Sequence, residues 1–172
     1  MIRSFRGKKP KIAESALISE AAYIIGNVEI GERCSVWPGA VVRADCDVLQ
    51  PGLGTKIGEN THIEDNAVVH ATAVIGSNVV IGHGAVVEAL RIGDNVIIGD
   101  NATVLTFAEV GSYCIVAAGA MVRQGMKIPD RSFVVGIPAE IKGELSAKQI
   151  ATIEETWLGV VALVEDYKKD GF

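Results

Sequence analysis

Aliphatic residues return every six positions along most of this chain. One series spans residues 12–48, a second 57–87 and, after a five-residue step, a third 92–134. Period six is neither the 3.6 of an amphipathic helix nor the 2 of a plain strand. It matches a short strand plus a tight corner, with the aliphatic residue (the anchor) pointing inward and a following glycine tolerating the corner backbone. Three sides close an eighteen-residue coil, so the repeat predicts an all-β solenoid, a parallel β-helix of about seven coils.

The segment 49–56 interrupts this repeat. It contains Pro51, Gly52 and Gly54, which are typical of a protruding loop. We expect either a tolerated surface insertion or a lid over a neighbouring cleft, since long loops on rigid scaffolds are often functional. After Val134 the repeat stops at the turn 136–139, so the predicted solenoid covers residues 1–140.

The remaining residues, 141–172, follow a helical spacing. Ser146 can cap a helix, and Lys168 and Lys169 suit its C-terminal end. One apolar stripe runs between them, made of Ile150, Ile153, Trp157, Val160, Val164 and Tyr167. We expect a C-terminal α-helix that folds back and packs this stripe along the solenoid.

Charge and cysteine content narrow the function classes. The net charge is -5 and no basic cluster is present, which argues against nucleic acid as a partner. The three cysteines are widely spaced without a C-x-x-C motif, which favours reduced thiols over disulfides or a zinc knot. We see no signal peptide and no apolar run of bilayer length. We therefore expect a soluble cytoplasmic protein that does not associate with membranes.

The histidines gather in one stretch, 57–88, and suggest a metal site. His70 and Glu88 are eighteen apart and both follow an anchor, so they should stack about 4.8 Å apart and could share a metal ion. His83 has a different phase, so one chain does not bring it to this pair, whereas a symmetric neighbour could. We therefore expect a trimer with sites between subunits. The alternative is that these are hydrogen-bonded surface groups, because every solenoid stacks polar residues.

Further charged residues surround these positions. Asp65 lies eighteen before His83 and could orient its ring. Arg43 and Glu64 share a phase one coil apart when the loop is allowed for, and Asp45 adds a second carboxylate. We interpret this set as an ion-pair network at a subunit interface, structural rather than catalytic.

Several of these segments resemble the γ-class carbonic anhydrases and their relatives. The segments are Ser35–Pro38 leading to Arg43–Asp45, then Asn60–His70, Ile81–Gly84 and Gly136–Ala139. The resemblance covers nearly the whole chain and implies a left-handed β-helix. It also implies a homotrimer that binds zinc, or iron or cobalt, between subunits through three histidines, and reversible hydration of carbon dioxide to bicarbonate by a metal-bound hydroxide. Two of those histidines match His70 and His83, and Arg43, Asp45 and Asp65 match the family's interface network.

The chain departs from the family pattern at the third ligand, where it has Glu88. A carboxylate should raise the pKa of the bound water, which predicts weak carbon dioxide hydration. His62 and Glu64 stand where the family has Asn and Gln near the bound solvent. We expect Glu64 to relay protons, and His62 to be either a substitute nitrogen ligand or a surface residue near a corner. The family's helix tyrosine falls near Val160.

Two other function classes stay open. A hexapeptide acyltransferase using coenzyme A would need basic groups for the cofactor phosphates, and the late coils offer only Arg123 and Lys127. A catalytically inert trimeric scaffold would explain the loss of a ligand histidine. The sequence leaves open whether metal is bound, which metal it is, and whether carbon dioxide is the true substrate.

Overall fold

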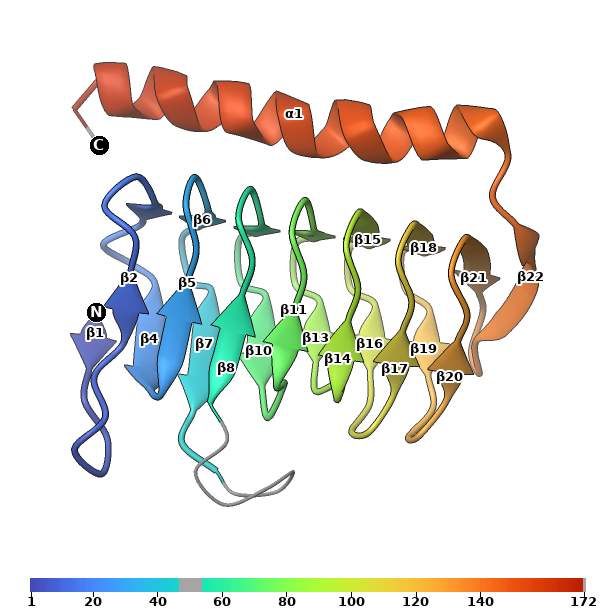
Figure 1. Ribbon diagram of the computed structural model, residues 1–172, viewed down its shortest axis with the longest axis horizontal. Coiled ribbons are helices and arrows are strands. Elements are labelled where there is room, and N and C mark those ends of the chain that lie inside the picture. The colour runs from blue at the N-terminus through green and yellow to red at the C-terminus, as the bar shows by residue number, and fades with distance from the viewer. Residues whose placement is uncertain (47–53, 172) are drawn as a thin grey trace.

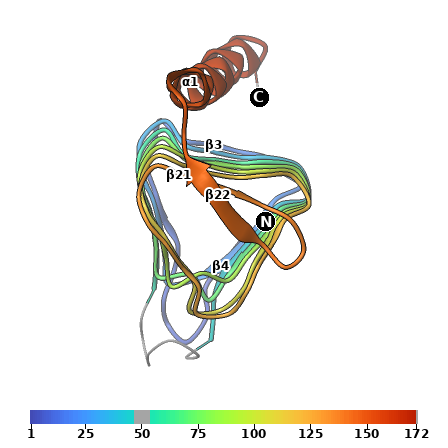
Figure 2. The ribbon, with the colours of Figure 1, turned by 90° about the vertical axis from the view of Figure 1, so that its right-hand side faces the viewer.

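Short strands stack from coil to coil into three parallel sheets around a triangular core, and one long helix lies along the outside (Figures 1 and 2). The computed structural model describes residues 1–46 and 54–171. The predicted anchor Val48 lies outside these residues, as does most of the segment 49–56 that was proposed as a loop or lid. Because the chain forms a β-helix of about seven coils, the fold prediction is confirmed, including the helix at its end.

The first sheet, called the apolar sheet for its outward side chains, is hydrogen-bonded in the order given. Its strands are β1 (Ile2–Arg3), β4 (Tyr23–Gly26), β7 (Val41–Ala44), β10 (Val68–His70), β13 (Val86–Val87), β16 (Thr103–Val104) and β19 (Met121–Val122). The outward row before the anchors is Tyr23, Val41, Val68, Val86, Thr103 and Met121. These side chains are half-buried in a single chain, and the helix α1 lies over a different face (Figure 2).

The second sheet, the charged sheet, has an outward row of charged side chains that Val74 interrupts. Its strands are β2 (Lys11–Ile12), β5 (Val28–Ile30), β8 (Thr55–Ile57), β11 (Val74–Ile75), β14 (Arg91–Ile92), β17 (Glu109–Val110) and β20 (Lys127–Ile128). The row reads Lys11, Glu29, Lys56, Val74, Arg91, Glu109 and Lys127. Lys11 and Glu29 are 3.3 Å apart, and Lys127 and Glu109 are 3.0 Å apart, so this face is suited to water.

The third sheet, the helix-covered sheet, lies beneath α1. Its strands are β3 (Leu17–Ile18), β6 (Ser35–Val36), β9 (His62–Ile63), β12 (Val80–Ile81), β15 (Val96–Ile98), β18 (Cys114–Val116), β21 (Ser132–Val135) and β22 (Glu140–Glu144). β22 runs antiparallel to β21 after the turn at Ile137–Pro138, which ends the stack of parallel strands. A further strand that the repeat did not predict, β1, pairs Ile2 with Ile24 at the other end.

The predicted anchors form the core. Every anchor in the described part of the chain is buried, apart from Ile12 and Ile18 in the first coil, which are half-buried. Thr55 and Lys56 were assigned to the loop, and this was wrong, because both lie in β8. Thr55 is 2% exposed and pairs with Val28, as suits a β-branched side chain on an inner strand position.

The glycines that follow the anchors serve close packing rather than an unusual backbone conformation. Several of the corners with positive φ are held by asparagines, for example Asn60, Asn78 and Asn95, whose amides also bond from coil to coil. Gly76 has no positive φ, but a Cβ there would lie 2.6 Å from the carbonyl oxygen of Gly93. Our prediction that a glycine after the anchor tolerates an unusual corner backbone was therefore wrong for Gly76.

The helix α1 (Ala147–Lys169) begins as predicted and packs most of the predicted stripe on the solenoid, although Tyr167 is 38% exposed. Ser146 caps it, and the side chain of Gln149 completes the capping box. Ile153 and Val164 are fully buried against the helix-covered sheet, while Trp157 and Val160 are half-buried. No helix in the described part of the chain combines the length and hydropathy needed to cross a membrane.

Candidate metal centre

His70 and Glu88 lie side by side on the apolar sheet, as their spacing predicted. Val69 pairs with Val87, which places His70 Nδ1 3.5 Å from Glu88 Oε1. The hydroxyl of Thr106 donates to Glu88 Oε2 at 3.2 Å and holds the other carboxylate oxygen. His70 Nε2 is buried and makes no hydrogen bond to any described residue. Among the described residues, one ring nitrogen is therefore left without a hydrogen bond next to a fixed carboxylate.

Arg43 and Asp45 join this pair, and Glu64 does not. Arg43 aligns with His70 and forms an ion pair of 3.0 Å with Asp45, whose Oδ1 is 3.5 Å from His70 Nε2. The predicted Arg43–Glu64 stack was wrong. Val42 aligns with Val69 and not with Ile63. Our count, which included Val48 as an anchor, was therefore wrong by one side of the prism across the insertion.

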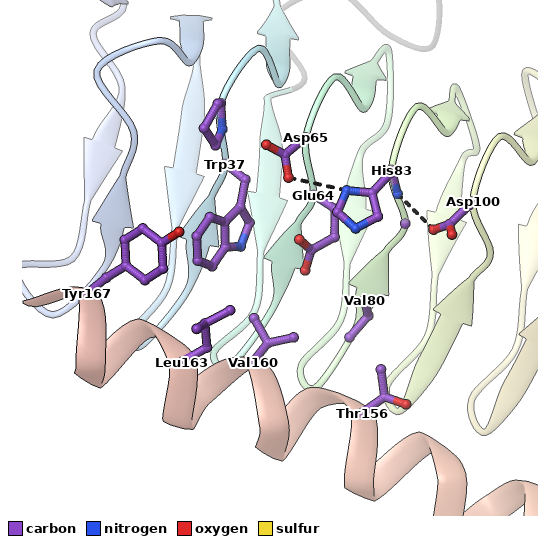
Figure 3. Close-up of a pocket in the computed structure, with 12 residues that line it drawn as sticks. Trp37, Glu64, Asp65, Val80, His83, Asp100, Thr156, Val160, Leu163 and Tyr167 are labelled. Carbon is purple, nitrogen blue, oxygen red and sulfur yellow. Dashed lines mark hydrogen bonds and ion pairs between the residues drawn. The ribbon is translucent and has the colours of Figure 1, made fainter.

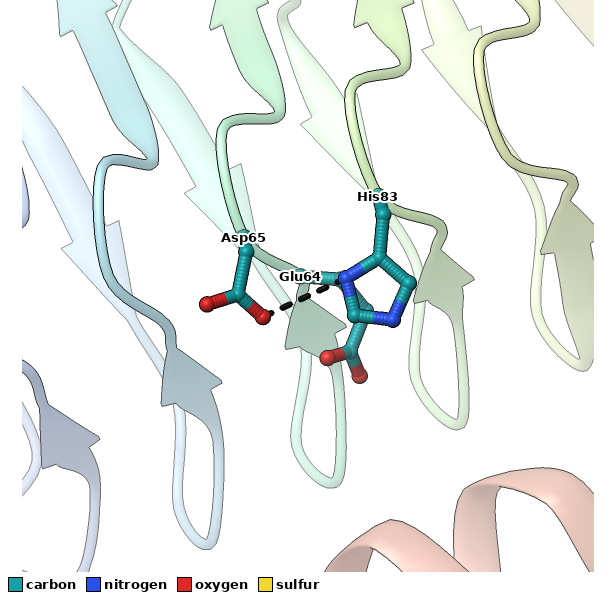
Figure 4. A group of neighbouring side chains, drawn as sticks. All are labelled: Glu64, Asp65 and His83. Carbon is teal, nitrogen blue, oxygen red and sulfur yellow. Dashed lines mark ion pairs between the residues drawn. The ribbon is translucent and has the colours of Figure 1, made fainter.

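The second cluster joins Glu64, Asp65 and His83 at the corner between the helix-covered and apolar sheets (Figure 4). His83 Nδ1 lies 3.2 Å from Asp65 Oδ2, a distance at which Asp65 could orient this ring. Ligand atoms of all three residues lie within 4.8 Å of one another, and in the described part of the chain this is the one group of three that does so. We call these two clusters, His70 with Glu88 and Glu64 with Asp65 and His83, the two half-sites of the candidate metal centre.

The two half-sites lie on opposite edges of the apolar sheet. His83 precedes β13 and Glu88 follows it, so the width of that strand separates them. His70, Glu88 and His83 do not come together within one chain, as the phase difference predicted. A common site would need a second chain that presents its His83 edge to the His70 edge of the first.

Glu64 faces a pocket of about 460 Å³ between the solenoid and α1 (Figure 3). Burial raises the pKa of Glu64 to about 7, an effect that His83 opposes and that Asp65 and Asp100 reinforce. The residue aligned with Glu64 in the next coil is Gly82, because Ile63 pairs with Ile81. Since Gly82 has no side chain, it leaves room beside the carboxyl group.

Trp37 and Tyr167 also line this pocket, and our sequence analysis gave neither of them a part in a site. Trp37 precedes Glu64 by one coil in the same phase, a signal hidden by the miscounted loop. Tyr167 packs edge-on against Trp37 with ring centroids 5.1 Å apart. The helix therefore offers a tyrosine to the cleft at Tyr167, while Val160, near the place that we matched to the family's tyrosine, provides an apolar wall.

His62 belongs to neither half-site. The expectation of a surface residue was wrong, because His62 is fully buried under α1 and its Nδ1 lies 2.8 Å from the hydroxyl of Ser35. Burial lowers the pKa of His62 to about 4, and the Trp157 backbone opposes this only in part. Its Nε2 makes no hydrogen bond within the described residues. A side chain at the position before an anchor points outward from the solenoid. On this sheet α1 covers the outward side chains, so His62 is buried beneath the helix.

Comparisons with known proteins agree with this architecture. The model of a family described as bacterial transferase hexapeptide (six repeats) matches residues 9–44, 54–89 and 90–124. A Methanocaldococcus jannaschii protein named "Probable carbonic anhydrase" is 41% identical over 160 residues, which make up 91% of this chain and 99% of that protein. A Geobacillus kaustophilus protein named "Carbonic anhydrase" is 39% identical over 61 residues, 36% of this chain and 34% of its own.

A solved structure extends the likeness to three dimensions. The crystal structure of a hexapeptide transferase family protein from Anaplasma phagocytophilum has a TM-score of 0.88 to this chain at 28% identity. The match covers 96% of this chain and 97% of the other. The similar proteins are thus named either carbonic anhydrases or a hexapeptide transferase. The choice between these two functions therefore depends on the residues of the site.

Proposed function

The chain belongs to the hexapeptide-repeat family and, within it, to the proteins related to γ-class carbonic anhydrases, and from this premise we propose that it is a homotrimeric metalloprotein that hydrates carbon dioxide reversibly. His70 and Glu88 of one subunit and His83 of the next would hold the metal ion. Two imidazoles and a carboxylate are a donor set that zinc accepts, and iron or cobalt is compatible with it. The free, buried thiols of Cys34 and Cys114 suit the reducing cytoplasm.

The observation that carries this proposal is the state of His70. Its Nε2 is buried without a hydrogen bond to any described residue and lies 3.5 Å from Asp45 Oδ1. Its Nδ1 is next to Glu88, whose second oxygen is held by Thr106. A buried polar atom without a partner costs about 1–3 kcal/mol. A metal ion is one ligand that would remove this cost and also use the neighbouring carboxylate.

The trimer is supported by the chemistry of the three faces. One sheet is covered by α1 and one presents paired charges to water, which leaves the apolar sheet without a cover. The His70 and His83 half-sites lie on the two edges of that sheet. Packing three chains through it would bury the apolar row and bring unlike edges together.

Within such a site each residue of this chain has a definite task. A bound divalent ion supplies Lewis-acid activation of water for attack on carbon dioxide. Asp65 orients the His83 ring, and Arg43 and Asp45 form an ion pair beside His70. Glu64, with a pKa of about 7, can accept and release a proton at neutral pH. Glu88 brings a negative charge where a third imidazole would be neutral, so the hydration rate should be low.

Metal content and a single variant test this proposal. Protein that has never met a chelator should contain about one divalent ion per subunit, and Glu88→His should hydrate carbon dioxide faster than the wild type, followed by stopped-flow pH change. Metal content far below one ion per subunit would favour the inert scaffold. Full occupancy without any gain in Glu88→His would separate the metal site from carbon dioxide chemistry.

The second candidate is an acyltransferase that uses coenzyme A, because the Anaplasma phagocytophilum structure is named for a hexapeptide transferase family. The pocket beside Glu64 is an unfavourable place for the cofactor's phosphates, since three carboxylates and no lysine or arginine are among its described lining residues. A coenzyme A titration distinguishes the two functions, and we expect no saturable binding.

A further inference from the structure

The pocket between α1 and the solenoid contains a hydrogen-bond donor that no described residue uses. Trp37 is only 6% exposed, and its Nε1 has no hydrogen-bond partner among residues 1–46 and 54–171. In Figure 3 the indole and the Glu64 carboxylate face the same space. Buried indole N–H groups in proteins normally find an acceptor. The pocket is therefore prepared for a ligand that carries an acceptor atom.

The opposite wall offers acceptors and negative charge. Asp65 is paired with His83, and Asp100 accepts a hydrogen bond from the His83 backbone at 3.0 Å, so Glu64 is the carboxyl group left to face a ligand. No lysine or arginine is among the described lining residues. An anionic ligand would meet like charges in a partly desolvated site, which disfavours it.

The remaining wall is apolar and comes from the helix. Val160 and Leu163 point from α1 toward Trp37 and Glu64, and Tyr167 closes one end against the indole (Figure 3). The volume of about 460 Å³ lies within the range of small-molecule sites, roughly 300–1,000 Å³, and is far more than carbon dioxide needs.

We propose that this pocket binds a small, uncharged carboxamide with a branched apolar tail. The carbonyl oxygen accepts the hydrogen bond of Trp37 Nε1, the amide N–H donates to Glu64, and the tail packs against Val160 and Leu163. The head group supplies one acceptor and one donor without net charge, which is the complement of the two polar walls. All the residues named here belong to one chain, so binding requires no metal ion.

The two tryptophans of the chain allow a direct test by nuclear magnetic resonance. Full-length protein, as purified and after removal of metal by a chelator, is titrated with isovaleramide while the two indole N–H signals are followed. We expect the Trp37 signal, assigned with Trp157→Phe, to move saturably while the Trp157 signal stays in place. Isovalerate, with the same tail but a carboxylate head, should bind at least about tenfold more weakly.

Matched variants examine the apolar wall. Leu163→Ala removes a half-exposed side chain that lines the pocket and should weaken isovaleramide by about threefold to tenfold. Leu158→Ala, on the same helix but not part of the lining, should leave the affinity unchanged. The proposal is overturned if no saturable shift occurs, if both indoles move alike, or if isovalerate binds as tightly as the amide. If isovaleramide still binds to the metal-free protein, the pocket functions independently of the proposed metal site, and a failure of one proposal does not imply a failure of the other.

Discussion

His62 illustrates how little a spacing says about a single side chain. The repeat correctly places it one residue before an anchor, with its side chain outward. Only the fold shows that α1 covers this row, so that the ring is fully buried next to Ser35. The lowered pKa follows from that burial, since a charged imidazole loses its hydration there.

This residue makes acid stability predictable. The folded pKa of about 4 lies below the unfolded value of 6.5, so the unfolded chain binds more protons as the pH falls from 6.5 to 4. Stability is then lost across this window, by about 2 kcal/mol between pH 7 and pH 5 from His62 alone. Urea unfolding at both pH values should show that His62→Gln reduces this loss. An equal loss in the variant would contradict the assignment.

The strands and corners are the scale at which the sequence is most informative. Anchors every six residues are sufficient to predict the core, the three sheets and the stacking of His70 on Glu88, because nothing irregular lies between these two. The Arg43 register failed because the length of an insertion does not say how many sides of the prism it replaces. The glycine column was recognised, but its cause, close approach of neighbouring coils, depends on distances that no pattern contains.

Two glycine substitutions test whether close approach of neighbouring coils is what requires glycine at Gly76. Gly76→Ala should lower the stability by about 1–3 kcal/mol, since its Cβ would lie 2.6 Å from the Gly93 carbonyl oxygen. Gly159→Ala, in α1 with no atom within 4 Å, should instead stabilise the protein by about 0.5–1 kcal/mol. Thermal unfolding of both variants measures this difference. A neutral Gly76→Ala would mean that the coils can move apart without cost.

At the scale of the whole molecule, each of the three faces of the prism has a different surface. The helix-covered sheet forms the pocket at Trp37 and Glu64, the charged sheet faces water, and the apolar sheet carries the two half-sites at its edges. The contrast between the last two faces could not be predicted from the repeat alone, because both rows occupy the position before an anchor.

Two matched valines test which face is the subunit interface. Val86 lies in the apolar row and Val74, 45% exposed, in the charged row. Val86→Lys should reduce the mass in solution from trimer to monomer, since it would bury an unpaired charge. Val74→Lys should leave the trimer intact. Light scattering gives both masses, and a trimeric Val86→Lys would show that the chains associate elsewhere.

The shared metal centre is tested most directly by mixing two defective chains. His70→Ala and His83→Ala should each form trimers without metal when expressed alone. Expressed together in equal amounts, they should bind metal at about one site in four, because a His83→Ala chain supplies His70 and Glu88 while a neighbouring His70→Ala chain supplies His83. Metal analysis of mixed trimers that contain no more metal than either variant alone would contradict a site built between subunits.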